Sequence, residues 1–148
     1  MDILKLKKEK LYGEKLSVCI IYLNNKAFLE MVKEHEMPYA KKYNQESIAG
    51  DYMYALADEL YKEFTDKSYR LEEDKIVLLI CGGCGVYGCW DLLVNIRETE
   101  NTVIWENFHN PHRTKESPGG FWDYSDFGIF EFDKNNYYRE IEKLKIAK

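Results

Sequence analysis

The residues best suited to chemistry lie in one ten-residue segment, Cys81 to Trp90, whose sequence is CGGCGVYGCW. It holds three of the four cysteines and four of the nine glycines in a chain of 148 residues. Cysteine thiolates bind metal ions or take part in redox reactions. Glycines permit the tight backbone turns that bring such thiolates together.

A zinc site is the first interpretation of this segment. Cys81 and Cys84 have the CxxC spacing with which two thiolates from one turn bind a tetrahedral zinc ion. Cys89 is a candidate third ligand, and His112 or His109 is a candidate fourth. Structural zinc sites usually carry two close ligand pairs, and the second pair is missing here. Zinc is nevertheless the one cofactor that the sequence suggests.

Two other interpretations use the same thiols. In a redox site Cys81 would be the attacking thiolate and Cys84 its resolving partner, but activation normally needs a helix that begins at the motif. A strand-like run follows here instead, from Trp90 to Ile96. The third interpretation is structural, because free cysteines are small, apolar and usually buried. We favour the structural interpretation and leave the other two open.

A second group of candidate residues follows about twenty positions later, around the sequence WENFHNPHR. Histidine beside an aspartate can act as a base, and arginine can bind a carboxylate or phosphate with two parallel hydrogen bonds. The alternative is that these side chains only fasten a long loop to the strands. The candidate residues for binding a ligand or partner are His109, His112, Arg113, Trp105, Trp122 and Tyr124.

The second half of the chain resembles a family of small bacterial proteins of unknown function. The resemblance rests on three motifs: CGxxGCW at 84–90, WxxFxxPHR at 105–113, and WxY at 122–124 followed by GxFxFD at 128–133. It implies no particular activity. Members of the family tend to carry a cysteine two residues before the position of Cys84, where this chain has Gly82. This difference argues against a metal geometry built on Cys81.

Composition excludes several classes of function. The formal charge of −5 repels phosphate backbones and anionic membrane surfaces, so we expect neither a nucleic-acid nor a membrane partner. No apolar run approaches the length needed to span a bilayer, so the chain is predicted to be soluble and cytoplasmic. Thiols stay reduced in that compartment, so the cysteines are not expected to form disulfides. Oligomeric state is left open.

Apolar patterns predict the strands and helices that would position these residues. Strands are expected at 16–23, 75–80, 90–96, 102–108 and 128–132. A first helix is expected from Ala27 to about Met37, because Pro38 disfavours its continuation. Ser47 is expected to cap a second helix, and Asp133 a third. The expected apolar stripes are Phe28, Met31, Val32, His35 and Tyr39 in the first, Met53, Leu56, Ala57, Leu60 and Phe64 in the second, and Tyr137, Ile141 and Leu144 in the third.

This order of elements predicts a single α+β domain over 1–148, with a largely antiparallel sheet of about five strands and helices packed on one face. Residues 1–14 are expected to form a polar lead-in. Neither a nucleophile beside the histidines nor a phosphate-binding glycine motif is present in the sequence. We therefore expect a non-catalytic binding module, with an immunity-type inhibitor as one such protein. The alternative is a small metal- or thiol-dependent enzyme that uses the Cys81–Cys89 loop with His109, His112 and Arg113.

Overall fold

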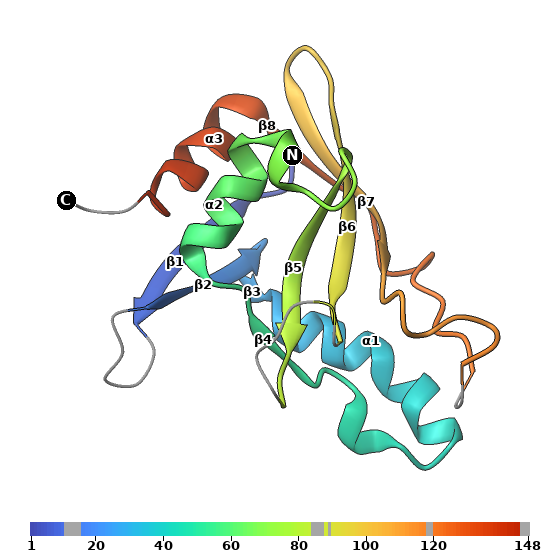
Figure 1. Cartoon of the computed structure of the whole chain (residues 1–148). Coiled ribbons are helices and arrows are strands. Elements are labelled where there is room, and N and C mark those ends of the chain that lie inside the picture. Colours follow the sequence, from blue (N-terminus) through green and yellow to red (C-terminus); the bar gives the residue numbers. More distant parts are fainter. Residues whose placement is uncertain (11–15, 84–87, 89, 118–119, 146–148) are drawn as a thin grey trace.

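The chain folds as an α+β structure with two antiparallel sheets and three α-helices in the described residues (Figure 1). This computed structural model describes residues 1–10, 16–83, 88, 90–117 and 120–145. One sheet has five strands in the order β4-β5-β6-β7-β8, and it is curled. The other has three strands in the order β1-β2-β3. The predicted fold class is confirmed.

The five-stranded sheet contains the strands that the apolar runs predicted in the second half of the chain. Its strands are β4 (Tyr52–Tyr54), β5 (Lys75–Cys81), β6 (Leu92–Glu98), β7 (Thr102–His109) and β8 (Phe130–Asp133). The side chains from Ile76 to Ile80 are all buried, as expected for a central strand covered on both faces. The turn between β6 and β7 makes a hairpin, with Glu98 opposite Val103.

The three-stranded sheet contains β1 (Leu4–Lys10), β2 (Ser17–Leu23) and the short β3 (Lys26–Ala27). The expectation that residues 1–14 form a polar lead-in is wrong for residues 4–10, which pair with β2 along their whole length. Leu4 and Leu6 are buried while the lysine between them is exposed. This alternation with period two marks a strand with one buried face, although charged residues dominate its composition.

Helix α1 (Phe28–Lys42) continues through Pro38, so the predicted end near Met37 is wrong. Pro38 lies on the exposed side of the helix, where the disturbance of the backbone faces water. The buried side chains of α1 recur every four residues and are Phe28, Val32, Glu36 and Ala40. A glutamate therefore occupies the core-facing stripe, directly after the first two apolar residues.

The predicted second helix is wrong in its first half. Residues Glu46–Ile48 form a 3₁₀ turn (η1), Tyr52–Tyr54 form β4, and only Ala57–Thr65 are helical (α2). Met53 is therefore a strand residue that pairs with Ile80. Gly50 interrupts the helical pattern because its φ of 66° lies in the left-handed region. The extended segment after Gly50, which is β4, then pairs with the edge of β5.

The third predicted helix is confirmed as α3 (Lys134–Glu142). The carboxylate of Asp133 accepts a hydrogen bond from the backbone N–H of Asn136 at 3.0 Å, as an N-cap should. Tyr137, Ile141 and Leu144 are buried, as predicted. A second 3₁₀ turn, η2 (Lys67–Tyr69), follows α2 and leads into the turn before β5.

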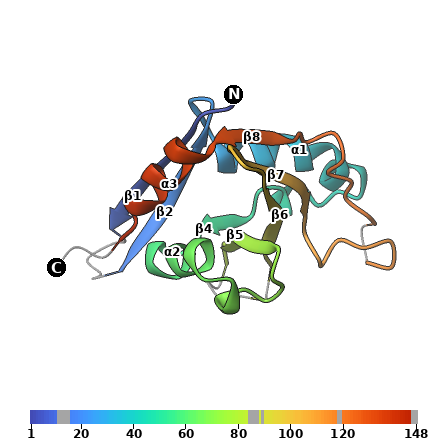
Figure 2. The ribbon, with the colours of Figure 1, turned by 90° about the horizontal axis from the view of Figure 1, so that it is seen from above.

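The two sheets are joined at both ends. At one end, the N–H of Asp2 donates to the carbonyl of Glu131 in β8, and at the other the N–H of Cys19 donates to the carbonyl of Ala55, which directly follows β4. Both outer strands of the five-stranded sheet are thus partly covered, which protects edges that would otherwise pair with other chains. The view from above shows β1 and β2 on one side of the curled sheet and the loop after β7 on the other (Figure 2).

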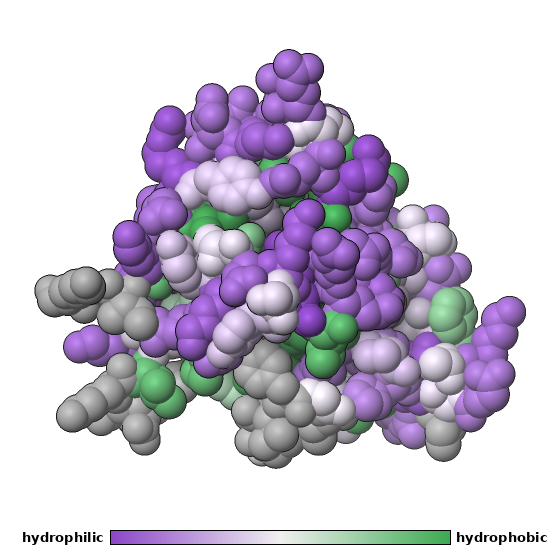
Figure 3. All heavy atoms as spheres, turned by 45° about the horizontal axis from the view of Figure 1, so that its top comes forward, coloured by the Kyte–Doolittle hydropathy of each residue, from purple (hydrophilic) through white to green (hydrophobic). Residues whose placement is uncertain are grey.

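The surface is mostly hydrophilic. On the face shown in Figure 3, hydrophilic side chains predominate and hydrophobic ones form small separate areas. None of the described helices is long and apolar enough to cross a membrane. Large apolar residues that stay exposed in the described chain include Leu71, Ile129, Phe121 and Tyr69.

Candidate functional site

Arg113 lies in the interior between two tryptophan rings. Its guanidinium carbon is 5.6 Å from the centre of the Trp90 ring and 5.2 Å from that of Trp122, and the residue is 5% exposed. Trp122 meets Trp90 edge to face, and His112 stacks on Trp90 at 6.0 Å between ring centres. Such cation–π contacts stabilise a guanidinium that has been removed from water.

Beside these rings lies a buried carboxyl group that belongs to α1. Glu36 accepts hydrogen bonds from the hydroxyls of Tyr52 (2.6 Å) and Tyr124 (2.5 Å), and from the backbone N–H of Gly50 (2.8 Å). The amide of Asn110 donates to the Tyr52 hydroxyl at 2.9 Å. The group connects α1, the turn before β4, β4 itself, the end of β7 and the segment before β8.

Burial raises the pKa of Glu36 to about 7, although its hydrogen bonds and the nearby charge of Arg113 act in the opposite direction. Burial also raises the pKa of Tyr52 and Tyr124, so both stay protonated as donors. Glu36, Tyr52, Tyr124, Asn110 and Arg113 are all buried. Their hydrogen bonds are made to one another and to the backbone, so the cluster holds several segments of the chain together.

The loop that starts at Asn110 is fastened by the same residues. The Asn110 side-chain oxygen accepts from the N–H of His112 at 2.9 Å, and its carbonyl accepts from the N–H of Arg113 at 3.0 Å. These bonds form an Asx turn, which directs Arg113 inward and leaves His112 exposed. This geometry supports the loop-fastening interpretation of Asn110, His112 and Arg113.

The cysteine segment is only partly described. Cys81 ends β5, lies opposite Tyr52 in the sheet and is half-buried. Cys84 and Cys89 lie outside the described residues, so the zinc and redox interpretations stay untested. Among the residues that are described, no group of three or more His, Cys, Asp or Glu side chains could hold a metal ion. Burial raises the pKa of the remaining cysteine, Cys19, to about 12, so that thiol stays protonated.

The other candidates from the sequence are divided between core and surface. Trp105 is fully buried, and its indole N–H donates to the Tyr137 hydroxyl at 3.0 Å. It is therefore a packing residue with no surface to offer a ligand. His109 is half-buried, and its Nδ1 lies 2.9 Å from the carbonyl oxygen of Asn107. Trp122 and Tyr124 belong to the buried cluster around Arg113 and Glu36.

An open hollow of about 450 Å³ lies in front of this cluster, and we call it the Arg113 hollow. Buried side chains form part of its lining, and exposed Phe121 and Ile129 stand at its rim together with the acidic Glu106 and Asp123. Its lining also includes His109, Arg113, Trp122 and Tyr124. Four of the candidate residues from the sequence thus lie beside one surface hollow.

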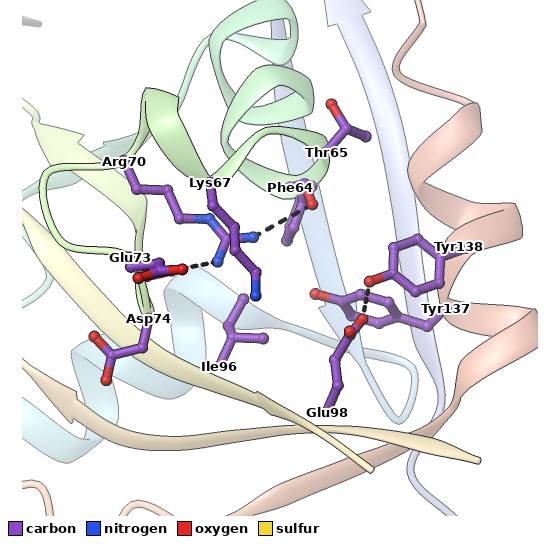
Figure 4. A pocket seen from close by; sticks show the side chains of 10 residues that line it. All are labelled: Phe64, Thr65, Lys67, Arg70, Glu73, Asp74, Ile96, Glu98, Tyr137 and Tyr138. Atoms are coloured by element: carbon purple, nitrogen blue, oxygen red, sulfur yellow. Dashed lines mark hydrogen bonds between the residues drawn. The ribbon is translucent and has the colours of Figure 1, made fainter. Parts of the chain in front are cut away.

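A larger hollow of about 770 Å³ lies between α2, the turn after η2 and α3 (Figure 4). Its arginine is already engaged, because Arg70 donates to the carbonyl oxygens of Glu63 (2.6 Å) and Glu73 (2.7 Å). The Tyr138 hydroxyl donates to Glu98, and Lys67 extends toward Ile96. Charges of both signs line this hollow, so it has no clear preference for an anion or a cation.

The third hollow, which we call the α2 groove, runs beside α2 and β5 and has a volume of about 380 Å³. It combines apolar walls with carboxylates. Leu71 is 80% exposed at its rim, whereas Glu63 and Asp91 are only 6% and 2% exposed. The groove is lined by Leu56, Glu59, Glu63, Tyr69, Leu71, Val77 and Asp91.

Glu63 and Asp91 are held in place by backbone groups. Glu63 accepts a hydrogen bond from the N–H of Val77 at 3.1 Å, and Asp91 accepts one from the N–H of Gly88 at 2.7 Å. Burial raises the pKa of Glu63 to about 7, and the charges of Glu59 and Asp91 act in the same direction. Burial likewise raises the pKa of Asp91.

The sequence predictions did not include Glu36, Glu63 and Asp91. A signal was present for the two glutamates, because each falls in the apolar stripe of its helix: Glu36 follows Val32 by four residues and Glu63 follows Leu60 by three. A charged residue in such a stripe is either paired or functional. Asp91 falls within the strand that the sequence predicted at 90–96, and in the structure it directly precedes β6.

Comparisons of the chain with protein-family models, with curated proteins and with solved structures gave no significant match. The resemblance of the second half to a family of small bacterial proteins therefore stays a prediction. The geometry of the chain itself is the basis for a functional proposal.

Proposed function

We propose that this chain is a non-catalytic binding module whose partner is a basic protein, as in an inhibitor of the immunity type. The observation that carries the proposal is the α2 groove, where exposed Leu71 and Tyr69 stand beside three carboxylates. A partner surface with apolar side chains next to positive charge would complement both features. The formal charge of −5 would also attract such a partner over a distance.

The burial of the polar cluster supports a binding role over catalysis. The groups best able to transfer protons, Glu36, Tyr52 and Tyr124, bond to one another inside the molecule. They are engaged in fastening the loop and α1 to the sheet. The α2 groove, by contrast, presents exposed apolar side chains and carboxylates together, which suits contact with a protein.

A display experiment tests this proposal although the partner is unidentified. A random peptide library is selected on the immobilised protein at low salt, and the enriched peptides are sequenced. We expect enrichment of Lys or Arg beside apolar residues, and binding that weakens as salt is raised. The Leu71→Asp variant should lose this binding, because it places a charge on the apolar rim.

The matched control is Ile129→Asp, which makes the same kind of change at the rim of the Arg113 hollow, where Ile129 is 67% exposed. This control should bind the selected peptides as the unaltered protein does. Enrichment of acidic peptides, or loss of binding in the control but not in Leu71→Asp, would contradict the proposal.

The second candidate is a small enzyme or ligand-binding protein that uses the Arg113 hollow with the Cys81–Cys89 loop. One observation favours it: among the described residues, the buried indole N–H of Trp122 has no hydrogen-bond acceptor, and Trp122 lines that hollow. Elemental analysis and native thiol titration test this candidate. Stoichiometric zinc or a fast-reacting thiol would favour it over the binding module.

A further inference from the structure

In the described part of the chain, the α2 groove contains two buried carboxyl groups that have no positively charged partner. Glu63 and Asp91 are more than nine-tenths buried, and neither forms an ion pair with a described residue. In addition, Oδ1 of Asp91 is buried and accepts no hydrogen bond from the described residues. Burying a carboxylate without a cation is costly, so carboxyl groups placed in this way are candidates for a site where a ligand supplies the missing charge.

The nearest positive side chains are already engaged. The Nζ of Lys62 lies 3.9 Å from Oε1 of Glu59 and 5.1 Å from the centre of the Tyr69 ring, and Lys62 does not line the groove. Arg70 acts on Glu63 through its charge, but its guanidinium donates to main-chain carbonyl oxygens. His112 affects Asp91 only as a weaker charge, and it is exposed and stacked on the Trp90 ring. None of them occupies the groove.

The walls of the groove suit the stem of a long cationic side chain. Leu56, Leu71, Val77 and Tyr69 are apolar, and Glu63 and Asp91 supply the carboxylates. Lysine and arginine bury their methylene groups against apolar surface while the charged end reaches a polar partner. Inside a groove with little water, such a charge pair is stronger than on an open surface.

We propose that the α2 groove binds one lysine or arginine side chain of a partner protein, with Glu63 and Asp91 as the carboxylate ligands of its charged end. This inference rests on the proposed binding function and specifies its central contact. Oδ1 of Asp91 would accept the hydrogen bond that it lacks, and Leu71 and Tyr69 would cover the stem. Glu59, which already has Lys62 nearby, would contribute only to the surrounding field.

A defined pair of probes tests the contact. Blocked Leu-Lys-Leu is titrated into the ¹⁵N-labelled protein and compared with blocked Leu-norleucine-Leu, which has a similar length and no charge. We expect the lysine peptide to shift the amide signals of Val77 and Gly88, whose N–H groups donate to Glu63 and Asp91. The affinity of such a short peptide is expected to be on the order of millimolar. The norleucine peptide should bind much more weakly.

The Glu63→Gln and Asp91→Asn variants should each weaken lysine-peptide binding by about tenfold. Both amides keep an oxygen that can accept the existing backbone hydrogen bond, so the fold is preserved. The matched control is Glu106→Gln in the Arg113 hollow, which should bind like the unaltered protein. Should Asp91→Asn fail to fold, Glu63→Gln alone decides the test.

Equal binding of the two peptides, or equal affinity of Glu63→Gln and the unaltered protein for the lysine peptide, would overturn the cation site. Failure of this site and failure of the binding function are distinguishable. Display-selected peptides that depend on Leu71 but not on Glu63 would retain the binding module and remove the cation site. A lysine peptide that binds without any display enrichment would retain the site and remove the protein partner.

Discussion

At the residue scale, the most constrained position is Gly50. Its φ of 66° lies in the left-handed region, and a Cβ there would be 2.5 Å from the Cβ of Lys33 on α1. Its N–H also donates to Glu36. Glycine is thus required both by the backbone angle and by the close approach of helix and turn.

Gly50→Ala should destabilise the protein by about 2–3 kcal/mol, because the cost of a left-handed non-glycine residue and that of a steric overlap with the Cβ of Lys33 on α1 add together. Urea denaturation followed by tryptophan fluorescence measures this loss. Gly83→Ala is the control, since the nearest atom to a Cβ there is 3.9 Å away. Equal stability of Gly50→Ala and the unaltered protein would show that helix and turn are not held this closely.

Glu36 and Glu63 give a testable dependence of stability on pH. Burial raises the pKa of each from 4.5 to about 7, so the folded state binds more protons than the unfolded state between these values. The stabilisation is fully present below pH 4.5 and is lost as the pH rises through about 7. For each group this is on the order of 3 kcal/mol.

We therefore expect the free energy of unfolding to fall between pH 5 and pH 7.5 and the slope to be smaller in Glu63→Gln. Denaturation curves at several pH values measure both slopes. The control is Glu131→Gln, which makes the same change at an exposed position. A slope that Glu63→Gln leaves unchanged would show that this carboxyl has an ordinary pKa.

At the scale of elements, two segments that look like surface in the sequence are structural. Strand β1 contributes Leu4 and Leu6 to the core, and the Leu6 N–H donates to Glu140 of α3 at 2.9 Å. The loop after β7 is anchored by Arg113 between Trp90 and Trp122. Each segment connects parts of the chain that are far apart in sequence.

Leu6→Ala should cost about 2–4 kcal/mol, as large-to-small changes in a core do. Exposed Lys5→Ala should change stability by less than about 0.5 kcal/mol. Thermal unfolding monitored by circular dichroism compares the two. A small effect of Leu6→Ala would show that β1 contributes little to the stability of the core.

Arg113→Met should destabilise the protein by about 3 kcal/mol, because it removes two cation–π contacts and a buried charge near Glu36. His112→Ala, which removes one exposed ring from the face of Trp90, should cost less than about 1 kcal/mol. Urea denaturation of both variants measures the difference. Full stability of Arg113→Met would argue instead that the arginine serves a ligand at the hollow.

At the scale of the whole molecule, the bridges at Asp2 and Cys19 join the two sheets at both ends. One continuous core runs between them, with residues from both sheets and all three described α-helices. Helix α2 packs against a strand of each sheet, β2 in one and β5 in the other. The two are therefore expected to unfold together, as small single domains usually do.

Native-state hydrogen exchange measures this cooperativity. The slowest amides of β2 and of β6 should exchange with the same free energy, equal to that of global unfolding. Separate free energies for the two strands would show that the three-stranded sheet opens independently.

The sequence alone predicted most elements that carry a strong local signal. The apolar runs of β2 and β5 and the cap at Asp133 are local properties, because side-chain period and turn chemistry depend on neighbouring residues. The motifs also singled out His109, Arg113, Trp122 and Tyr124, which lie beside one surface hollow. The sequence did not predict strand β1, because its lysines obscure the alternation of its two buried leucines. It also did not predict β4, because this short strand forms by pairing with the edge of β5.

Only the tertiary structure decided which charged groups are buried and what faces them. Glu36 and Glu63 occupy apolar stripes, but Tyr52, Tyr124 and Asp91 come from segments that the chain order does not place nearby. The pKa of a carboxyl group depends on water exclusion and on charges from every packed element, which are properties of the assembled core. The α2 groove exists for the same reason, since α2, the turn after it, β5 and Asp91 just before β6 form it together.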